Sequence, residues 1–558
     1  MLYRPERPLT VQGDHTVLLE VNHPDYERAR DLLVRFAELE KSPEFVHTYR
    51  LSPLSLWNAA AAGHAAAELL QGLEEFGKFE VPAQVRGNVE DLMSRYGRLR
   101  LLSEGGELYL EADDPLLLTG LRRKERLKEL LGEPVGEHRN RLVPGYRGRL
   151  KQELLKLGHP VDDRAGYRAG EAFRMQLAPV TRAGRPLKVR DYQQAAAAAF
   201  HQSGGPAGGS GVVVLPCGAG KTLVGLSALA KLRTATLILV TGEAAAQQWR
   251  REILDKTTAD PADIGLYTGE EKEVRPITIA TYQILVHRRH REDEFRHLEL
   301  FSRRDWGLII YDEVHLLPAP IFRLTAELQA YRRLGLTATL VREDGRADEV
   351  FSLIGPKRYD LAWKRLEEQG WIAPAVCTEI RVPLDGHAER YFLAEPREQA
   401  QVAATNPAKI PWVKALLARH PGEPTLVIGQ YLDQLERIAR ELAAPLLTGK
   451  VPNKRREELY QQFREGSIPC LVVSKVANFA IDLPDATVAV QVSGTFGSRQ
   501  EEAQRLGRIL RPKSDGRTAH FYTLVSHGTV EQDFALKRQL FLTEQGYRYR
   551  LVLPEDQS

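Results

Sequence analysis

The sequence has only three cysteines and three methionines in 558 residues, and it lacks long apolar runs. Three scattered cysteines, Cys217, Cys377 and Cys470, make neither a disulfide framework nor a cysteine metal site, which favours a reducing cytoplasm. No apolar run reaches the roughly 18 residues that a membrane-spanning helix needs, and the amino terminus shows no apolar signal core. A disulfide-rich secreted protein and a membrane protein are therefore both excluded.

The chain also has little net charge. A formal charge of +3 cannot by itself indicate a polyanionic partner, so a nucleic-acid partner must be argued from local patches. One such patch is residues 121–156, in which eleven lysines or arginines stand against five glutamates. The same stretch is equally typical of a solvated helix face with extra arginines.

The length of 558 residues predicts three or four domains, each able to bury its own core. In residues 1–97, the spacing predicts a helix after Ser52, a second from about Ala65 to Phe76 and a third after Pro82. Alternating apolar residues then predict a β-hairpin, so the whole is typical of a winged helix, which serves DNA binding or protein docking. Residues 98–178 hold the wing and the basic stretch.

The remainder alternates short apolar strands with helices, first over residues 179–358 and then over 359–558. The first set includes "TATLILVT", "ITIATY", "WGLIIYDEVH" and "RRLGLTATL". The second includes "PTLVIGQ", "CLVVSKV", "ATVAVQVS" and "HFYTLVS". Strands joined by helices of ten or more residues imply parallel sheets, so we expect an α/β fold with two doubly wound domains.

Residues 212–222, "VVVLPCGAGKT", place a glycine-rich turn after a buried strand. Backbone amides of Gly218, Ala219 and Gly220 can converge on an anion, and the following helix offers its positive end. Lys221 is then expected to contact the β- and γ-phosphates of ATP, and Thr222 to give a hydroxyl to Mg²⁺. Leu215 stands where the strict P-loop pattern has glycine, so a plain turn remains an alternative.

About ninety residues later, "LIIYDEVH" ends a buried strand with two carboxylates. Asp312 can hold Mg²⁺, and Glu313 can orient or deprotonate the attacking water. Such a pair is usually a solvated loop, but we expect this strand to lie adjacent to that of the P-loop, which favours an ATP site.

A helical stretch near the end, "EAQRLGRILRPK", carries Arg508 and Arg511 on one face with Gln504 one turn earlier. Across a cleft from Lys221, the arginines would neutralise charge on the γ-phosphoryl group, an effect of about a thousandfold or more in rate. A basic surface helix is the alternative.

The order of "RDYQ", "LPCGAGKT", "QQWRREI", "ATYQIL", "DEVH", "LTATL", "IDLP" and "QRLGRILR" resembles the superfamily two helicases and translocases, which have two RecA-like domains. Four stretches narrow the resemblance to the bacterial and archaeal type of the xeroderma pigmentosum group B (XPB) family of DNA repair helicases: "LPCGAGKT", "RED" after "LTATL", "SKVANFAIDLPDA" and "GSRQEEAQRLGRILR". "FVHTYRLSPLSLWNAAAAG" extends it to nearly the whole chain.

The resemblance implies roles for further residues. Gln193 would read adenine, and Asp482 would lie where the nucleotide and DNA sites meet. The residues implied to link hydrolysis to movement are His315, Thr337 and Thr339, and those implied to open strands are Arg342, Glu343 and Asp344. Residues 384–408 occupy the place of a thumb-like insertion, although their acidic charges put a DNA grip in doubt, and residues 98–175 that of a damage-recognition domain.

Motors that track the DNA backbone need phosphate contacts, and the candidates here are Thr281, Tyr282 and Trp249. For Trp249, packing of a helix onto the sheet is the favoured alternative.

The leading hypothesis is an ATP- and Mg²⁺-dependent DNA helicase acting in repair, with the 3′-to-5′ polarity implied by the resemblance alone. The alternatives are a duplex translocase, an ATP-gated DNA-binding scaffold and, less favoured, an RNA helicase. The expected partners are DNA as duplex, fork or single-stranded tail, and a nuclease or other repair protein. We expect a monomer with no membrane contact.

Overall fold

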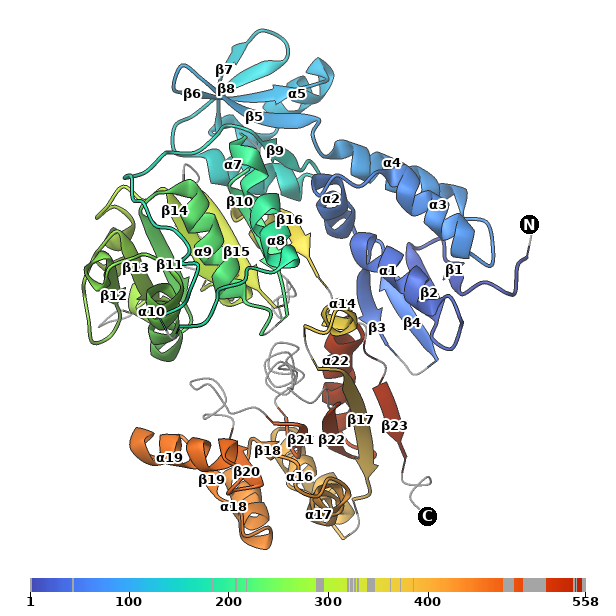
Figure 1. The fold of residues 1–558 in the computed structure, drawn as a ribbon. Helices are drawn as coiled ribbons and strands as arrows, with labels where there is room; N and C mark the ends of the chain where they lie inside the picture. Colours follow the sequence, from blue (N-terminus) through green and yellow to red (C-terminus); the bar gives the residue numbers. More distant parts are fainter. Residues whose placement is uncertain are drawn as a thin grey trace.

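The computed structural model describes residues 3–42, 45–182, 184–205, 208–216, 218–287, 296–318, 321, 325, 328, 331–338, 347–361, 363–371, 373–384, 386–474, 486–494, 518–544, 547 and 549–553. Four sheets organise the described residues (Figure 1). Two small sheets belong to the amino-terminal third, and two seven-stranded sheets form the rest. None of the helices in the described ranges is both long and apolar enough to cross a bilayer.

The first domain is a four-stranded antiparallel sheet covered by helices. The sheet order is β1-β2-β4-β3, and one buried cluster joins the sheet, through Val17, to all four helices, through Leu33, Leu56, Leu69 and Val85. The predicted helix after Ser52 is present, and Ser52 and Ser55 form a reciprocal capping box at its start. Its elements are β1 (Leu9–Val11), β2 (Thr16–Glu20), α1 (Tyr26–Phe36), β3 (Glu38–Lys41), β4 (Val46–Arg50), α2 (Pro53–Ala61), α3 (Ala66–Phe76) and α4 (Ala83–Arg95).

The predicted hairpin is present but is not a wing on these helices. Its strands β5 (Leu99–Glu104) and β6 (Glu107–Ala112) lie inside a separate five-stranded sheet of order β7-β8-β6-β5-β9, with its own buried cluster. The winged-helix interpretation of the hairpin is wrong, because β8 and β9, both distant in sequence, pair with its edges. The other elements are α5 (Pro115–Arg122), α6 (Glu125–Lys128), β7 (Leu131–Val135), β8 (Arg139–Leu142), α7 (Arg147–Lys156) and β9 (Val161–Asp163).

Part of the basic stretch is internal rather than a surface patch. Arg147 and Lys151 of α7 are buried and contact the Asp163 carboxylate at 2.7 and 2.9 Å. Burial would raise the pKa of Asp163, but the two cations outweigh it and lower that pKa. Arg139 pairs with Glu111 at 2.6 Å. These cations balance carboxylates of their own domain, which weakens the case for a nucleic-acid patch there.

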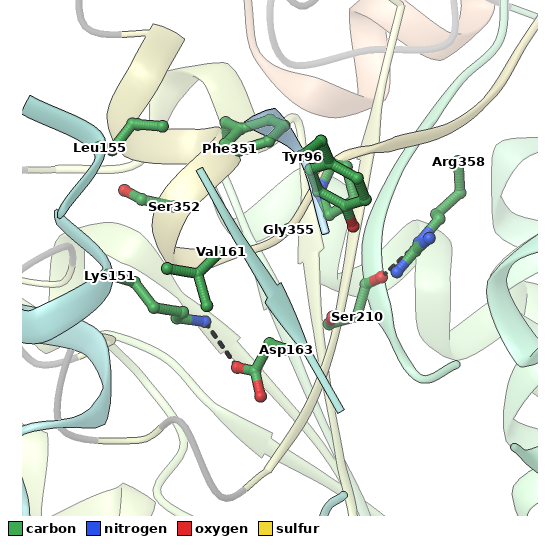
Figure 2. A pocket seen from close by; sticks show the side chains of 11 residues that line it. Tyr96, Lys151, Leu155, Val161, Asp163, Ser210, Phe351, Ser352, Gly355 and Arg358 are labelled. Carbon is green, nitrogen blue, oxygen red and sulfur yellow. Dashed lines mark hydrogen bonds and ion pairs between the residues drawn. The ribbon is translucent and has the colours of Figure 1, made fainter. Parts of the chain in front are cut away.

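The ion-paired group of Arg147, Lys151 and Asp163 lies at a boundary between domains. A small pocket there is lined by Tyr96, Lys151 and Asp163 of the amino-terminal third and by Ser210 and Arg358 of the first seven-stranded sheet (Figure 2). An apolar cluster of Trp57, Leu155 and Phe351 lies at the same boundary. The amino-terminal third is therefore packed firmly against the first large sheet.

The first large sheet, with its helices, forms lobe one (residues 184–361). All its pairs are parallel, in the order β12-β13-β11-β14-β15-β10-β16. The strand of the P-loop, β10, is not adjacent to β14 as expected, because β15 lies between them. Its edge strand β16 extends the lobe beyond the expected boundary at 358. The main elements are α8 (Asp191–His201), β10 (Ser210–Val214), α9 (Lys221–Leu232), β11 (Thr236–Val240), α10 (Glu243–Lys256), β12 (Ile264–Tyr267), β13 (Ile277–Thr281), α11 (Tyr282–Leu285), β14 (Leu308–Asp312), β15 (Arg332–Thr337), α13 (Ala347–Leu353) and β16 (Lys357–Asp360).

The second large sheet, again wholly parallel, forms lobe two (residues 373–553). Its order is β19-β20-β18-β21-β22-β17-β23, which confirms the two expected doubly wound domains. Two helices, α15 and α16, occupy the place of the expected insertion. The elements after lobe one are α14 (Trp363–Glu368), β17 (Ala375–Val382), α15 (Ala388–Leu393), α16 (Pro396–Ala404), α17 (Lys409–Arg419), β18 (Thr425–Gly429), α18 (Leu432–Glu441), β19 (Leu446–Leu447), α19 (Asn453–Arg464), β20 (Cys470–Ser474), β21 (Val488–Gln491), β22 (Ala519–Ser526), α22 (Glu531–Glu544) and β23 (Tyr549–Val552).

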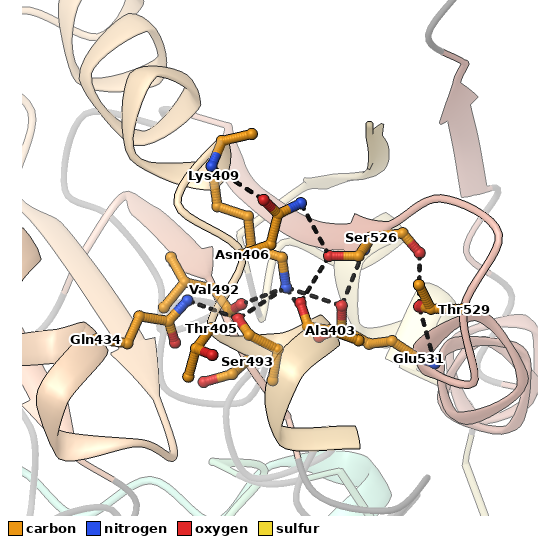
Figure 3. A network of polar contacts seen from close by, with 12 residues as sticks. Ala403, Thr405, Asn406, Lys409, Gln434, Val492, Ser493, Ser526, Thr529 and Glu531 are labelled. Atoms are coloured by element: carbon orange, nitrogen blue, oxygen red, sulfur yellow. Dashed lines mark hydrogen bonds and ion pairs between the residues drawn. The ribbon is translucent and has the colours of Figure 1, made fainter. Parts of the chain in front are cut away.

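A buried polar network joins the carboxyl ends of two strands of lobe two (Figure 3). The Lys409 ammonium is fully buried and donates to both oxygens of Glu531, at 2.9 and 2.8 Å, and to the Val492 carbonyl at 2.8 Å. Glu531 also accepts the Ser526 amide at 2.9 Å. The network thus fixes where the chain leaves β21 and β22.

Candidate ATP site and its surroundings

The P-loop lies between β10 and α9, and its conformation needs glycine. Gly218 and Gly220 have φ of 81° and 80°, in the left-handed region that side chains disfavour. A Cβ on Gly220 would stand 2.4 Å from the Gln193 side-chain amide, so the space is closed as well. Gly220 caps α9, and Lys221 and Thr222 are its first two residues, where the backbone amides of a helix start can bind an anion. This local geometry supports the phosphate-cradle interpretation over a plain turn.

Helix α8 holds the loop from behind. Gln193 donates its side-chain amide to the Ala219 carbonyl at 2.8 Å, and the Tyr192 hydroxyl donates to the same oxygen at 2.9 Å. Gln193 also accepts the Arg190 amide at 2.9 Å. The structure therefore places Gln193 against the P-loop. Tyr192 was missed by the sequence reasoning, although it stands directly before Gln193 in "RDYQ".

Lys221 and Glu313 meet at the carboxyl edge of the sheet, 92 positions apart in sequence. The ammonium nitrogen lies 3.0 Å from a Glu313 oxygen, and both side chains are largely buried. Burial opposes ionisation of Glu313, but Lys221 and His315 outweigh it and lower the pKa of that carboxyl. Glu313 has φ of 49°, an unusual value for a side-chain-bearing residue that turns the chain sharply after β14.

Asp312 lies beside this pair at the end of β14. One of its oxygens accepts the Trp249 indole N–H at 2.8 Å, and the other accepts the Glu313 amide at 3.1 Å. Burial, and after it the neighbouring Glu313 carboxylate, raises the pKa of Asp312 to about 6. The carboxyl groups of Asp312 and Glu313 lie close together, and their shared negative charge favours a cation nearby. Carboxylate and hydroxyl oxygens are the hard donors that Mg²⁺ prefers, so Asp312 and Thr222 fit that ion.

His315 connects the acidic pair to the next strand. Its Nδ1 lies 2.7 Å from the Thr337 hydroxyl and 3.7 Å from a Glu313 oxygen. Both His315 and Thr337 are buried. The structure therefore brings together two of the three residues expected to link hydrolysis to movement. The predicted residues outside the described part of the chain are Thr339, Arg342, Glu343, Asp344, Asp482, Gln504, Arg508 and Arg511, with Cys217.

The three candidates for DNA contact are all internal. Trp249, Thr281 and Tyr282 are 2%, 3% and 4% exposed. Thr281 caps α11 by accepting the Ile284 amide at 3.4 Å, and the Tyr282 hydroxyl donates to the Asp312 carbonyl at 2.8 Å. Burial disfavours a direct contact of these side chains with DNA. For Trp249, it supports the packing alternative.

These observations define the class of protein to which the chain belongs. Two tandem parallel-sheet domains, with a P-loop lysine paired to the glutamate of an acidic strand end, are the arrangement of a P-loop nucleotide-driven motor.

Comparisons with known proteins narrow the class. Residues 366–557 match the ERCC3/RAD25/XPB C-terminal helicase family, residues 9–135 a helicase conserved C-terminal domain, and residues 186–342 the type III restriction enzyme res subunit. The chain is 54% identical to the DNA 3′-5′ helicase XPB of Mycobacterium tuberculosis, covering 97% of each chain, and 55% identical to that of Kineococcus radiotolerans, covering 98% and 97%. It is 34% identical to the general transcription and DNA repair factor IIH helicase/translocase subunit XPB of Antonospora locustae, covering 98% of this chain and 82% of that one. The chain belongs to the XPB family of helicases, which confirms the predicted family.

Proposed function

We propose that this chain is an ATP-driven DNA helicase that separates duplex DNA in the 3′-to-5′ direction during repair. Its near full-length similarity to bacterial DNA 3′-5′ helicases supports the substrate and the polarity. The single observation that carries the chemistry is the 3.0 Å contact between Lys221 and Glu313 at the edge of lobe one.

The Lys221–Glu313 pair suggests how the site responds to nucleotide. Without ATP, the Lys221 ammonium neutralises Glu313, which keeps this carboxylate from acting on water. Phosphate oxygens entering the P-loop would compete for the same ammonium. Glu313, beside which His315 remains as a second group that lowers its pKa, would then be free to orient the attacking water.

The cation is assigned to Thr222 and Asp312. Mg²⁺ bound there would neutralise charge on the β- and γ-phosphates. Gln193 is assigned to adenine. From lobe two, Arg508 and Arg511, supported by Gln504, are proposed to complete the charge neutralisation across the cleft.

Other residues are proposed to couple ATP hydrolysis to movement and to open the strands. His315 with Thr337 and Thr339 would pass the state of the γ-phosphate to the sheet, and Asp482 would do so from lobe two. Strand opening is assigned to Arg342, Glu343 and Asp344. DNA is the substrate proposed, and a nuclease or other repair protein would act with a monomer of this chain.

The test is strand separation of a short fluorescent duplex carrying either a 3′ or a 5′ tail, with ATP and Mg²⁺. We expect release from the 3′-tailed duplex only. Lys221→Ala should abolish both release and ATP hydrolysis, whereas Lys231→Ala, at the exposed end of the same helix, should retain both. ATP hydrolysis stimulated by DNA without release would instead identify a duplex translocase. Retained hydrolysis in Lys221→Ala would overturn the site.

A further inference from the structure

Asp312 receives hydrogen bonds from two segments that are distant from it in sequence. The Trp249 indole N–H, from α10, bonds a carboxylate oxygen at 2.8 Å. The Tyr282 hydroxyl, from the start of α11, bonds the main-chain carbonyl of the same residue at 2.8 Å. Side chain and backbone of Asp312 are thus held by two separate elements.

The two elements follow neighbouring strands. Helix α10 follows β11, which lies between β13 and β14, and α11 begins directly at the end of β13. The site for a Cβ on Gly242, the residue that caps the start of α10, lies 3.7 Å from the Gln283 side chain of α11. The starts of α10 and α11 therefore adjoin at the edge of the sheet that also carries Asp312.

Each element has a buried side that reaches Asp312 and an outer side open to solvent. On α10, Trp249 is buried while Gln248 and Arg251 are exposed. On α11, Tyr282 is buried while Gln283 is exposed. Amide and guanidinium groups are typical donors to DNA phosphates. A ligand that pulls on the outer side must shift the inner side, because both lie on one short rigid element.

Trp249 is well placed to transmit such a shift. A Cβ on Gly225 of α9 would lie 2.8 Å from the tip of its ring and 3.4 Å from Ile310 of β14. The ring therefore fills the space between the P-loop helix and the strand of Asp312. The Trp249 ring moves with α10 when that helix is displaced. Because the interior is closely packed, the ring must then push against α9 and β14.

We propose that Trp249 and Tyr282 are positioning residues that couple DNA binding on the outer sides of α10 and α11 to the placement of Asp312 in the ATP site. The proposal rests on the proposed function, because it presumes hydrolysis stimulated by DNA. It replaces the direct DNA contact first expected of these side chains with an indirect one. DNA bound on the outer sides would shift both donors: Trp249 orients the Asp312 carboxylate, and Tyr282 fixes the main chain that carries it.

The experiment measures ATP hydrolysis against DNA concentration for Trp249→Phe and Tyr282→Phe in the full chain. Each change removes one donor and keeps a ring. The stimulation ratio, kcat with DNA over kcat without, should fall about 10-fold or more in Trp249→Phe, as expected for a lost bond to a charged group. The DNA concentration for half-maximal stimulation and the KM for ATP should stay within about twofold.

Two matched controls come from the same lobe. Trp306 is also fully buried, but its indole N–H donates to the Leu300 carbonyl at 3.0 Å, away from Asp312. Tyr311 directly precedes Asp312, but its hydroxyl lies 3.3 Å from that of Thr325. Trp306→Phe and Tyr311→Phe should keep the stimulation ratio of the unaltered chain.

Several results would overturn the coupling. They are an unchanged ratio in Trp249→Phe and Tyr282→Phe, equal losses with and without DNA, or a loss confined to DNA affinity. The last would return these residues to the DNA interface. An unaltered chain that hydrolyses ATP but ignores DNA would refute the proposed function and the coupling together, whereas normal stimulation with unaffected variants refutes the coupling alone.

A second measurement covers a variant that fails to fold. In the chain labelled with 5-fluorotryptophan, one fluorine resonance should be identified by its loss in Trp249→Phe or, if that variant is unstable, in Trp249→Tyr. That resonance should move when a short DNA duplex is added without ATP. A resonance that stays still at saturating DNA contradicts transmission through Trp249.

Discussion

The buried Lys409–Glu531 pair gives a stability prediction whose size follows from the structure. Lys409→Met keeps the length of the side chain but leaves the Glu531 carboxylate buried without its ammonium partner. Breaking a buried pair from one side costs about 3–5 kcal/mol. For a domain of roughly 150–250 residues, each kcal/mol shifts Tm by about 2–4 °C. The unfolding transition of lobe two should therefore fall by about 6–20 °C.

Because the chain has several domains, the assay must resolve lobe two. Calorimetry of the full chain gives the transition, and hydrogen exchange of β18 and β22 assigns it to this lobe. The matched control is Lys414→Met on the same helix, whose pair with Glu441 at 2.7 Å is exposed. Solvent screens an exposed pair and leaves it little net stabilisation, so this control should shift Tm only slightly.

A double change separates the charge from the packing. Lys409→Met with Glu531→Gln removes both charges and retains an oxygen that can accept the Ser526 amide. The double variant should be more stable than Lys409→Met alone, since no carboxylate is left unpaired. A shift below about 2 °C in the single variant, or a double variant that merely adds two losses, would refute the reasoning.

Two further predictions concern other domains. Burial, and after it Arg30, lowers the pKa of His47 from 6.5 to about 4, so the folded amino-terminal domain holds this ring neutral. The unfolded chain binds the proton first, so this contribution to stability is complete above pH 6.5 and is lost as the pH falls towards 4, by about 2 kcal/mol at pH 5. Hydrogen exchange of β2 between pH 7 and 5 checks it, and His47→Gln should flatten the dependence. In lobe one, Gly225→Ala would place a methyl 2.8 Å from the Trp249 ring, so we expect a loss of about 1–3 kcal/mol in chemical denaturation; an unchanged midpoint would show that the ring has room to move.

The strands that the sequence predicts are those with uninterrupted apolar runs. β10, β11 and β14 of lobe one are buried over nearly their whole length, and their composition shows it. β17 carries Glu379 and Arg381 inside its sheet. These charged residues interrupt its apolar run, so the sequence does not reveal it as a buried strand. Only the fold reveals that these two side chains pair with each other and that Gln539 donates to Glu379 at 2.6 Å. The hairpin was found, but its partners β8 and β9 lie too far along the chain for local patterns to assign.

The residues of the site also divide into those that local motifs predict and those that only the fold reveals. The P-loop and the acidic strand end are local motifs, so Lys221 and Glu313 were predictable, and the structure brings them to 3.0 Å. The contact of Trp249 with Asp312 was not predictable. A tryptophan on an amphipathic helix indicates burial but not which group its N–H will meet. Tyr282 likewise lies in a motif, and only the order of β13, β11 and β14 takes its hydroxyl to Asp312. Contacts between motifs depend on the fold, which spacing does not encode.

The amino-terminal third contacts both lobes, through contacts of different kinds. Towards lobe one it has the apolar cluster of Trp57, Leu155 and Phe351, and the Lys357 amide donates to Asn58 at 2.9 Å. Towards lobe two, β3 lies against α22 (Figure 1). An exposed ion pair joins Asp31 to Arg365 of α14, which precedes lobe two, at 2.9 Å. In mechanical terms, the apolar cluster resists shear, whereas the exposed ion pair adds little resistance. The apolar cluster should therefore keep the amino-terminal third with lobe one, which would enlarge the body against which lobe two moves in the proposed cycle.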